Sequence, residues 1–199
     1  MSVSIAFIVE GKTEKAFVPF LRAFLETRLA GRMPRIKPQP RDGRIPIGHK
    51  LRNEVRLLLK EYDHVIALTD VYTGTKDFVD SADAKEKMGA WVGESTAFHP
   101  HAAQYDFEAW LLPYWPRIQQ FSGYKGAAPP GDPEKVNHLR PPSKHVAEAF
   151  RLGGRRGYVK GRDVEKILEG ADLTLAIQKC DQLRELINTF LVVSGTDPI

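Results

Sequence analysis

Three short apolar runs along the chain have the length and composition of buried β-strands. They are Val3 to Val9, His64 to Thr69 and Ala97 to Gln104. Runs of this length between turn-forming or polar residues are typical of strands covered on both faces. A fourth run, Met33 to Pro40, contains prolines, which cannot donate to a β-ladder. We therefore expect that run to be an edge strand.

Apolar residues recur at helical spacing between these runs. The first such segment has its apolar positions between Phe17 and Leu25, with Thr13 as the expected N-cap. Pro19 should kink this helix or mark its first turn. Ile47 to Tyr62 and Ala82 to Trp91 also have helical patterns. Strands that alternate with helices predict an α/β fold with a parallel sheet and right-handed crossovers.

The last third of the chain lacks strand patterns. Residues Gly123 to Pro142 are rich in Gly and Pro, which predicts a loop or a small excursion. Beyond it, apolar residues at spacings of three and four predict a C-terminal helix. These residues are Leu173, Ile177, Cys180, Leu183, Ile187 and Phe190. We expect an α/β domain over 1–122, with a loop and helical C-terminal extension over 123–199 packed on the same domain.

Composition narrows the class of protein. The 199 residues are 42% hydrophobic and 27% charged, which fits one folded domain with an elaboration and argues against a disordered chain. No run of about 18 apolar residues predicts a membrane span. The N-terminus lacks the basic and long apolar regions of a signal peptide. Cys180 is the single cysteine, which excludes an internal disulfide framework and a multi-cysteine zinc site. We expect a cytoplasmic protein with no membrane partner.

The net charge of +4 conceals an uneven distribution. Arg28 to Arg56 contains nine Lys and Arg residues against Asp42 and Glu54, a net charge of +7. Arg140 to Arg162 contains seven against Glu148, a net charge of +6. The rest of the chain therefore carries −9. Two basic stretches in an otherwise acidic protein favour a polyanionic partner near an acidic site.

Acidic residues follow three of the predicted strands. They are Glu10 with Glu14, then Asp70, then Asp106 with Glu108. In a parallel sheet, ligands bind outside the carboxyl ends of the strands. Carboxylates that converge there repel one another, and a hard cation such as Mg²⁺ relieves the repulsion and activates water or a phosphate. The alternative is that these acids only cap the helices that follow.

A nucleotide-binding loop is a second interpretation of the first strand end. Gly11-Lys12-Thr13 follows a strand, as in a G-x-x-x-x-G-K-[ST] loop, but Ala6 stands where the first glycine is required. The segment is also too short to wrap phosphates. A small NTP-binding enzyme would bind nucleotide in a manner that depends on Lys12.

Several motifs together resemble a known family. They are Val9-Glu10-Gly11-Lys12-Thr13-Glu14, Ala67-Leu68-Thr69-Asp70-Val71-Tyr72, Gln104-Tyr105-Asp106-Phe107-Glu108-Ala109, Pro142-Ser143-Lys144 and Gly157-Tyr158-Val159-Lys160. Their order and spacing resemble the Toprim-like domain-of-unknown-function family 4276, from near Val3 to about Phe190. This family is similar to the Toprim domains of OLD-type nucleases, topoisomerases and primases, whose acidic residues bind Mg²⁺ for phosphodiester chemistry. Members are often encoded beside an ATPase, and several pairs are associated with phage defence.

The resemblance implies roles for the acids. Glu10 matches the Toprim glutamate, a metal ligand or general acid/base, and Glu14 matches a second acid of OLD-like nucleases. Asp70 matches the first Asp of the Toprim D-x-D pair, whereas Tyr72 replaces the second. That replacement puts two-metal binding in question.

Further residues complete the set that the resemblance implies. Glu108, or Asp106 before it, would compensate as a metal ligand for the acid that is missing. Lys144 and Lys160 also match family positions, and each would neutralise charge on a transferring phosphate, unless it is an ordinary surface lysine.

The resemblance thus predicts a Toprim-like α/β fold and an Mg²⁺- or Mn²⁺-dependent nuclease. Its substrate would be DNA or RNA, with an AAA/ABC-type ATPase as a partner in phage defence. The alternative is a catalytically inactive Toprim-like subunit that binds or docks an ATPase. Tyr72 favours the alternative.

Overall fold

The computed structural model describes residues 2–41, 43–72, 76–136, 140–154 and 156–199. Its centre is a four-stranded parallel sheet of β1 (Ser4–Val9), β2 (Arg35–Pro40), β3 (His64–Asp70) and β4 (Phe98–Ala103). The strands lie in the order β2-β1-β3-β4. These strands confirm the α/β fold with a parallel sheet, and β2 lies at an edge, as its prolines predict.

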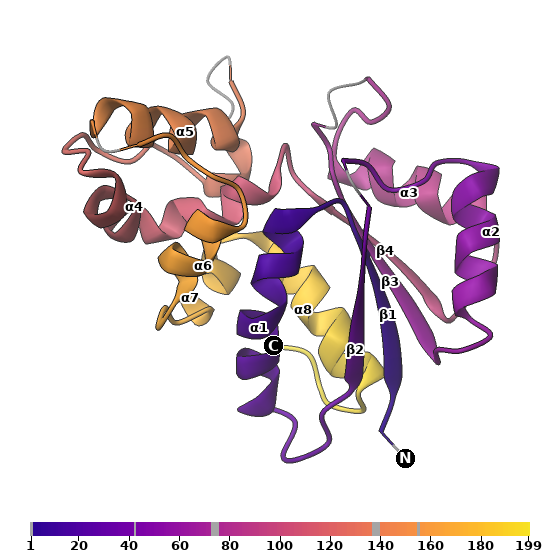
Figure 1. The fold of residues 1–199 in the computed structure, drawn as a ribbon. Coiled ribbons are helices and arrows are strands. Elements are labelled where there is room, and N and C mark those ends of the chain that lie inside the picture. Colours follow the sequence, from indigo (N-terminus) through magenta and orange to yellow (C-terminus); the bar gives the residue numbers. More distant parts are fainter. Residues whose placement is uncertain (1, 42, 73–75, 137–139, 155) are drawn as a thin grey trace.

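Helices cover both faces of the sheet (Figure 1). Helices α1 (Lys12–Glu26) and α8 (Asp181–Val193) pack on one face, and α2 (His49–Leu58) and α3 (Ser81–Val92) pack on the other. The alternation of side chains along β1 explains both cores. Ile5, Phe7 and Val9 enter the core beneath α1 and α8, while Ala6 and Ile8 enter the core beneath α2 and α3.

The chain after β4 is helical, which confirms the expected helices toward the C-terminus. The elements are η1 (Phe107–Tyr114), α4 (Trp115–Ser122), η2 (Pro133–Lys135), α5 (Pro142–Leu152), α6 (Arg162–Leu168) and α7 (Thr174–Lys179), followed by α8. Buried residues from these helices join the core of the α1 face. Figure 1 shows α4 to α7 gathered beside α1, on the side away from α2.

Two local predictions are wrong. Thr13 is not the N-cap of α1, because the Glu14 carboxylate accepts the Gly11 amide at 3.0 Å and the helix begins at Lys12. The C-terminal apolar residues do not form one helix, because Cys180 has extended backbone angles, φ −129° and ψ 102°, between α7 and α8. All six residues of that stripe are nevertheless buried.

The outer edge of β2 has few backbone N–H groups that point away from the sheet. The amides of Arg35 and Arg41 bond to β1, so the alternation of a strand directs those of Ile36, Pro38 and Pro40 outward. Proline has no N–H at two of these three positions. Arg22 also covers the outward carbonyl of Ile36, at 2.5 Å. None of the helices in the described part of the chain is long and apolar enough to cross a membrane.

Candidate metal and phosphodiester site

The strand order places two acidic strand ends at a topological switch point. From β1 the chain crosses to β2 on one side, and from β2 it returns past β1 to β3 on the other. In open α/β sheets, the crevice at such a point is where ligands bind. Glu10 directly follows β1 and Asp70 ends the adjacent β3. The predicted convergence of these two acids at the carboxyl edge is therefore observed.

Glu10 is fixed by β3. Its Oε1 accepts hydrogen bonds from the Thr69 hydroxyl at 2.5 Å and from the Asp70 amide at 3.0 Å. One turn into α1, Glu14 Oε2 accepts the Gly11 amide, as described above. The carboxylates of Glu10, just after β1, and Glu14, in α1, are thus held by backbone and hydroxyl donors at the carboxyl end of the sheet.

A left-handed residue returns the chain from β4 to this edge. Tyr105 has φ +69°, a conformation that costs a non-glycine residue roughly 1 kcal/mol or more. The turn lets the Phe107 amide donate to Asp70 Oδ1 at 2.9 Å. The Asp106 carboxylate accepts the Ser143 amide with both oxygens at 3.1 Å. The strained turn therefore lies between the strand and the second pair of acids.

A segment that links α5 to α6 closes over Glu108. We call residues 156–161 the strap. Tyr158 donates its hydroxyl to Glu108 Oε1 at 3.0 Å, and the Lys160 ammonium lies 3.6 Å from the same oxygen. Gly161 has φ +82° and approaches Lys12 so closely that a Cβ would lie 3.3 Å from it. The strap thus joins the N-terminus of α1 to the acids.

Asp163 holds the strap in place. This carboxylate is 1% exposed, accepts two hydrogen bonds from Arg156, at 2.5 and 3.1 Å, and accepts the Val159 amide at 2.7 Å. Its own amide donates to the Val159 carbonyl at 3.0 Å. Nothing in the sequence motifs marks Asp163, whereas Tyr158 and Ser143 lie inside motifs that the family resemblance already singles out.

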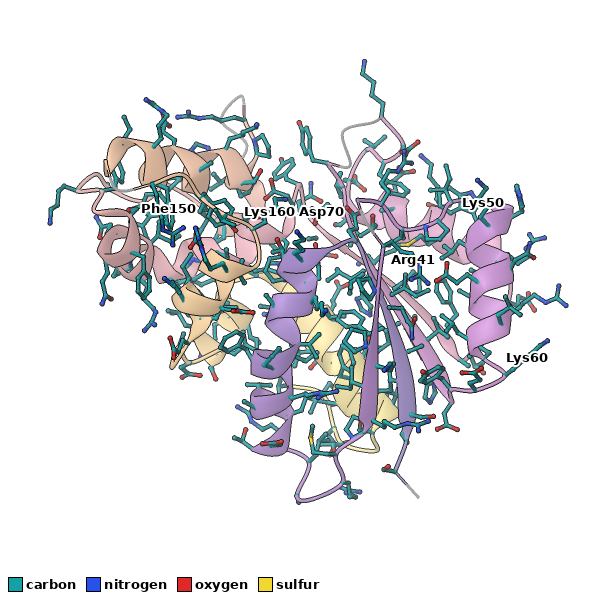
Figure 2. The ribbon with its side chains drawn as sticks, viewed as in Figure 1. Arg41, Lys50, Lys60, Asp70, Phe150 and Lys160 are labelled. Carbon is teal, nitrogen blue, oxygen red and sulfur yellow. The ribbon has the colours of Figure 1, made fainter. Side chains whose placement is uncertain are left out.

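The acids divide into two groups according to whether they line a hollow at this end of the sheet. A hollow of about 310 Å³ is lined by Glu10, Glu14, Asp70 and Lys160, together with Gly11, Lys12, Thr13 and Gly43. Figure 2 shows Asp70 and Lys160 at the same end of the molecule. Asp106 and Glu108 do not line this hollow and are 3% and 0% exposed. The structure brings all five predicted acids into one region and opens three of them to the hollow.

Burial and mutual repulsion raise the pKa values of these carboxyls. Burial raises the pKa of Glu10 to about 7, and the charge of Glu14 adds to the effect. Burial, followed by the charge of Glu108, raises the pKa of Asp106 to about 7. Burial also raises the pKa of Asp70 well above its ordinary range, with Glu14 and Glu10 contributing. Full ionisation of the cluster above neutral pH is therefore unfavourable unless a cation neutralises the carboxylates.

Of the two cations in the strap, Arg156 is paired with Asp163, and Lys160 supplies a positive charge to the acids. Burial alone would lower the pKa of Lys160, but the charges of Glu108, Asp70 and Asp106 raise it overall. Lys160 therefore stays protonated beside the acids. Lys144, in contrast, is exposed on α5 and makes no ion pair with any described residue. The structure places Lys160 at the site and leaves the Lys144 side chain outside it.

The donor chemistry suits a hard divalent cation. Carboxylate oxygens are its preferred ligands, and Glu108 Oε2 is buried with no hydrogen-bond partner among the described residues. However, the described residues contain no group of three or more His, Cys, Asp or Glu side chains that is already arranged to hold an ion. The described carboxylates are therefore not preorganised around an ion.

Comparison with solved structures defines the class of fold. The chain is similar to the C-terminal region of the Burkholderia pseudomallei OLD protein, with a TM-score of 0.55, 12% identity, and coverage of 98% of this chain and 100% of that one. The C-terminal region of the Xanthomonas campestris pv. campestris OLD protein matches with a TM-score of 0.44 and 12% identity, over 92% of this chain and 95% of that one. At these identities the likeness concerns the fold.

The sequence comparison gives the family. Residues 9–191 match DUF4276, described as "Domain of unknown function (DUF4276)", so the chain belongs to this family. That result confirms the resemblance drawn from the motifs. No curated protein matches the sequence.

Proposed function

We propose that this protein is a divalent-metal-dependent phosphodiesterase that acts on nucleic acid, with Mg²⁺ or Mn²⁺ as its ion. The observation that carries the proposal is the hollow at the switch point, where Glu10, Glu14 and Asp70 meet with Lys160. A phosphodiester substrate needs neutralisation of its charge and a positioned proton acceptor. Both kinds of group line this hollow.

Each residue has a role that follows from its surroundings. Glu10 has a pKa of about 7, so it exchanges protons at neutral pH and is suited to general acid/base work. Lys160 presents a protonated amine to the hollow, where it would bind a phosphate oxygen. One oxygen of each of the carboxylates Glu10 and Asp70 accepts a backbone amide, which fixes the orientation of the carboxylate. The other oxygen of each would then be available to bind a ligand.

A bound ion would be held by the acids that line the hollow, Glu10, Glu14 and Asp70. Asp106 and Glu108 lie behind them and would assist, the latter through its unpartnered Oε2. Such an ion supplies Lewis-acid activation of a phosphate or of water.

The test combines metal binding with cleavage. Wild type, Glu10→Gln and Asp70→Asn are titrated with Mn²⁺ by calorimetry and assayed on labelled DNA and RNA, alone and with any ATPase that is encoded beside the gene. We expect both variants to lose Mn²⁺ affinity and at least about 100-fold in cleavage rate. Glu86→Gln, an exposed acid on α3, is the matched control and should behave as wild type. If wild type cleaves no nucleic acid under any of these conditions, the proposal that the protein is an enzyme is wrong.

The second candidate is a Toprim-like subunit that docks an ATPase and has no catalytic activity. Tyr72 favours it, because this side chain stands where the family resemblance expects a second carboxylate and is 49% exposed. Equal and negligible Mn²⁺ affinity in wild type and in both variants, together with binding to the ATPase, would select this candidate over the phosphodiesterase.

A further inference from the structure

Helix α2 and the turn that follows it carry an exposed row of cations that no other described residue neutralises. Lys50, Arg56 and Lys60 are exposed and form no ion pair with any described residue. Arg56 and Lys60 border a shallow hollow of about 330 Å³ together with Asn53 and Leu57. Arg52 donates to the Trp91 carbonyl, which leaves its charge uncompensated as well. The acid of α2, Glu54, is already paired with Arg41.

The other basic stretch of the sequence is different. In the segment 140–162, Glu148 pairs with Arg140 and Arg151, and Asp163 pairs with Arg156 and Arg162. Lys160 lies beside Glu108. Thus most cations of the described part of this segment are engaged within the molecule, and Arg155 lies outside the described residues. The two stretches have similar net charge in the sequence, but the cations of α2 are more available to an external partner than those of 140–162.

Part of the row is also unfavourable for α2, although Arg56 lies in the last turn, where a positive charge is favourable. The first turn of α2 contains Lys50 and no acidic residue, so a positive charge lies at the positive end of the helix dipole. Arg52 and Arg56 are four residues apart on the helix, where like charges repel. Departures from local stability such as these are expected where a surface is kept for an external partner. A polyanion would relieve both conflicts.

The position of α2 connects the row with the acidic hollow. The loop from β2 to α2 contributes Gly43 to the lining of the hollow, and α2 then runs back along the sheet toward the start of β3. Figure 2 shows Lys50 at the end of α2 that lies toward Asp70, and Lys60 at the opposite end. Ten helical residues span about 15 Å, which equals the rise of about four to five base pairs.

We propose that the exposed face of α2 and of the turn after it, with Lys50, Arg56 and Lys60, is the surface that binds the phosphate backbone of the nucleic acid. This inference rests on the proposed function, because it assigns the substrate contact to one of the two basic stretches. Contacts of this kind provide affinity and position without base specificity. In this proposal the segment 140–162 contributes the strap beside the acids, and α2 contributes a basic surface that binds the backbone farther from the acids.

The test measures binding separately from cleavage. Fluorescence anisotropy of a labelled DNA duplex and of an RNA strand is recorded in EDTA between about 50 and 200 mM salt. The triple variant Lys50→Gln, Arg56→Gln, Lys60→Gln should bind at least about tenfold more weakly, and its log–log salt slope should be smaller by roughly two to three. The control variant Lys125→Gln, Lys166→Gln, Lys179→Gln removes the same charge from exposed positions and should keep the wild-type slope.

The outcomes separate this inference from the proposed function. Equal loss in both triple variants, or unchanged binding in the α2 variant, would overturn the inference even if the protein cleaves nucleic acid. Loss confined to the α2 variant would support it even if no cleavage is found. Lys50→Gln alone supplies a folding check: it should not lower the melting temperature, because it removes a positive charge from the first turn of α2, and it should still weaken binding.

Discussion

Glu10 is a carboxyl group that the fold buries without giving it a counter-ion of its own. It is 7% exposed, and its hydrogen-bond donors are the neutral groups of Thr69 and Asp70. Hydrogen bonds to the charged form lower the pKa, but burial outweighs them and the pKa rises to about 7. The folded protein therefore holds protons at this site that the unfolded chain releases.

This shift predicts how Glu10→Gln changes stability with pH in the absence of metal. The pKa in the fold is raised from 4.5, so the stability that Glu10 contributes is present below pH 4.5 and is lost as pH rises to about 7. Glutamine keeps an oxygen acceptor and has no charge. We expect the variant to match wild type near pH 4.5 and to exceed its free energy of unfolding by on the order of 3 kcal/mol above pH 7. Urea denaturation in EDTA across this range measures the difference.

A difference measurement is needed because another group has the opposite effect. Burial lowers the pKa of His101 from 6.5 to about 3, so this histidine destabilises the fold as pH falls below 6.5. It does so in wild type and variant alike. Glu86→Gln should follow wild type at every pH, and a Glu10→Gln difference that does not vary with pH would contradict the assignment.

At the scale of elements, the strap depends on a single buried carboxylate. Asp163→Asn retains one oxygen acceptor and loses the charge that Arg156 and the Val159 amide bind. We expect a loss of about 1–3 kcal/mol in the free energy of unfolding and faster hydrogen exchange of the Val159 amide. Asp181→Asn removes the partner of Arg184 in an exposed ion pair and an acid from the first turn of α8, so it should cost at most about 1 kcal/mol. Equal effects of the two substitutions would show that Asp163 does not hold the strap.

The edge strand β2 leads to a prediction about assembly. Pro38 and Pro40 occupy positions whose amides would point away from β1, so they leave little for a second chain to bind. Pro38→Val with Pro40→Val restores those donors, and we expect self-association at the edge of the sheet. Sedimentation velocity measures it. Gln39→Val changes a position that bonds toward β1 and should leave the protein in its wild-type state of association.

The success of the sequence predictions differs between elements for physical reasons. Strands β1 and β3 are covered on both faces, so their continuous apolar runs were sufficient to identify them. Helix η1 has 3-10 geometry and is buried almost all round, so it has no helical stripe to detect. The break at Cys180 was also invisible, because apolar spacing reports which side chains are buried and does not report a change of backbone direction between two helices.

At the scale of the whole molecule, topology explains how much of the site could be predicted. Parallel strands bring their carboxyl ends to one edge, so the clustering of Glu10 and Asp70 followed from the pattern alone. The pattern could not predict which acids are covered, because Asp106 and Glu108 are covered by α5 and the strap, which are distant from them in sequence. For the same reason the sequence could not show that Asp163 and Glu148 neutralise most of one basic stretch, whereas in the other only Arg41 and Arg44 form ion pairs among the described residues.

The resulting charge distribution predicts that metal and nucleic acid bind cooperatively. Three acids line the hollow, and their charges repel phosphates until a cation neutralises them. Cations on α2 attract the same backbone, so added salt weakens that attraction. With Asp106→Asn as a cleavage-impaired form, we expect duplex affinity to rise about tenfold or more with Mn²⁺ and to fall steeply with salt at fixed Mn²⁺. Anisotropy titrations over both variables measure this. Because linkage is reciprocal, the duplex must raise Mn²⁺ affinity by the same factor, and a calorimetric titration that finds no such gain would rule out the coupling.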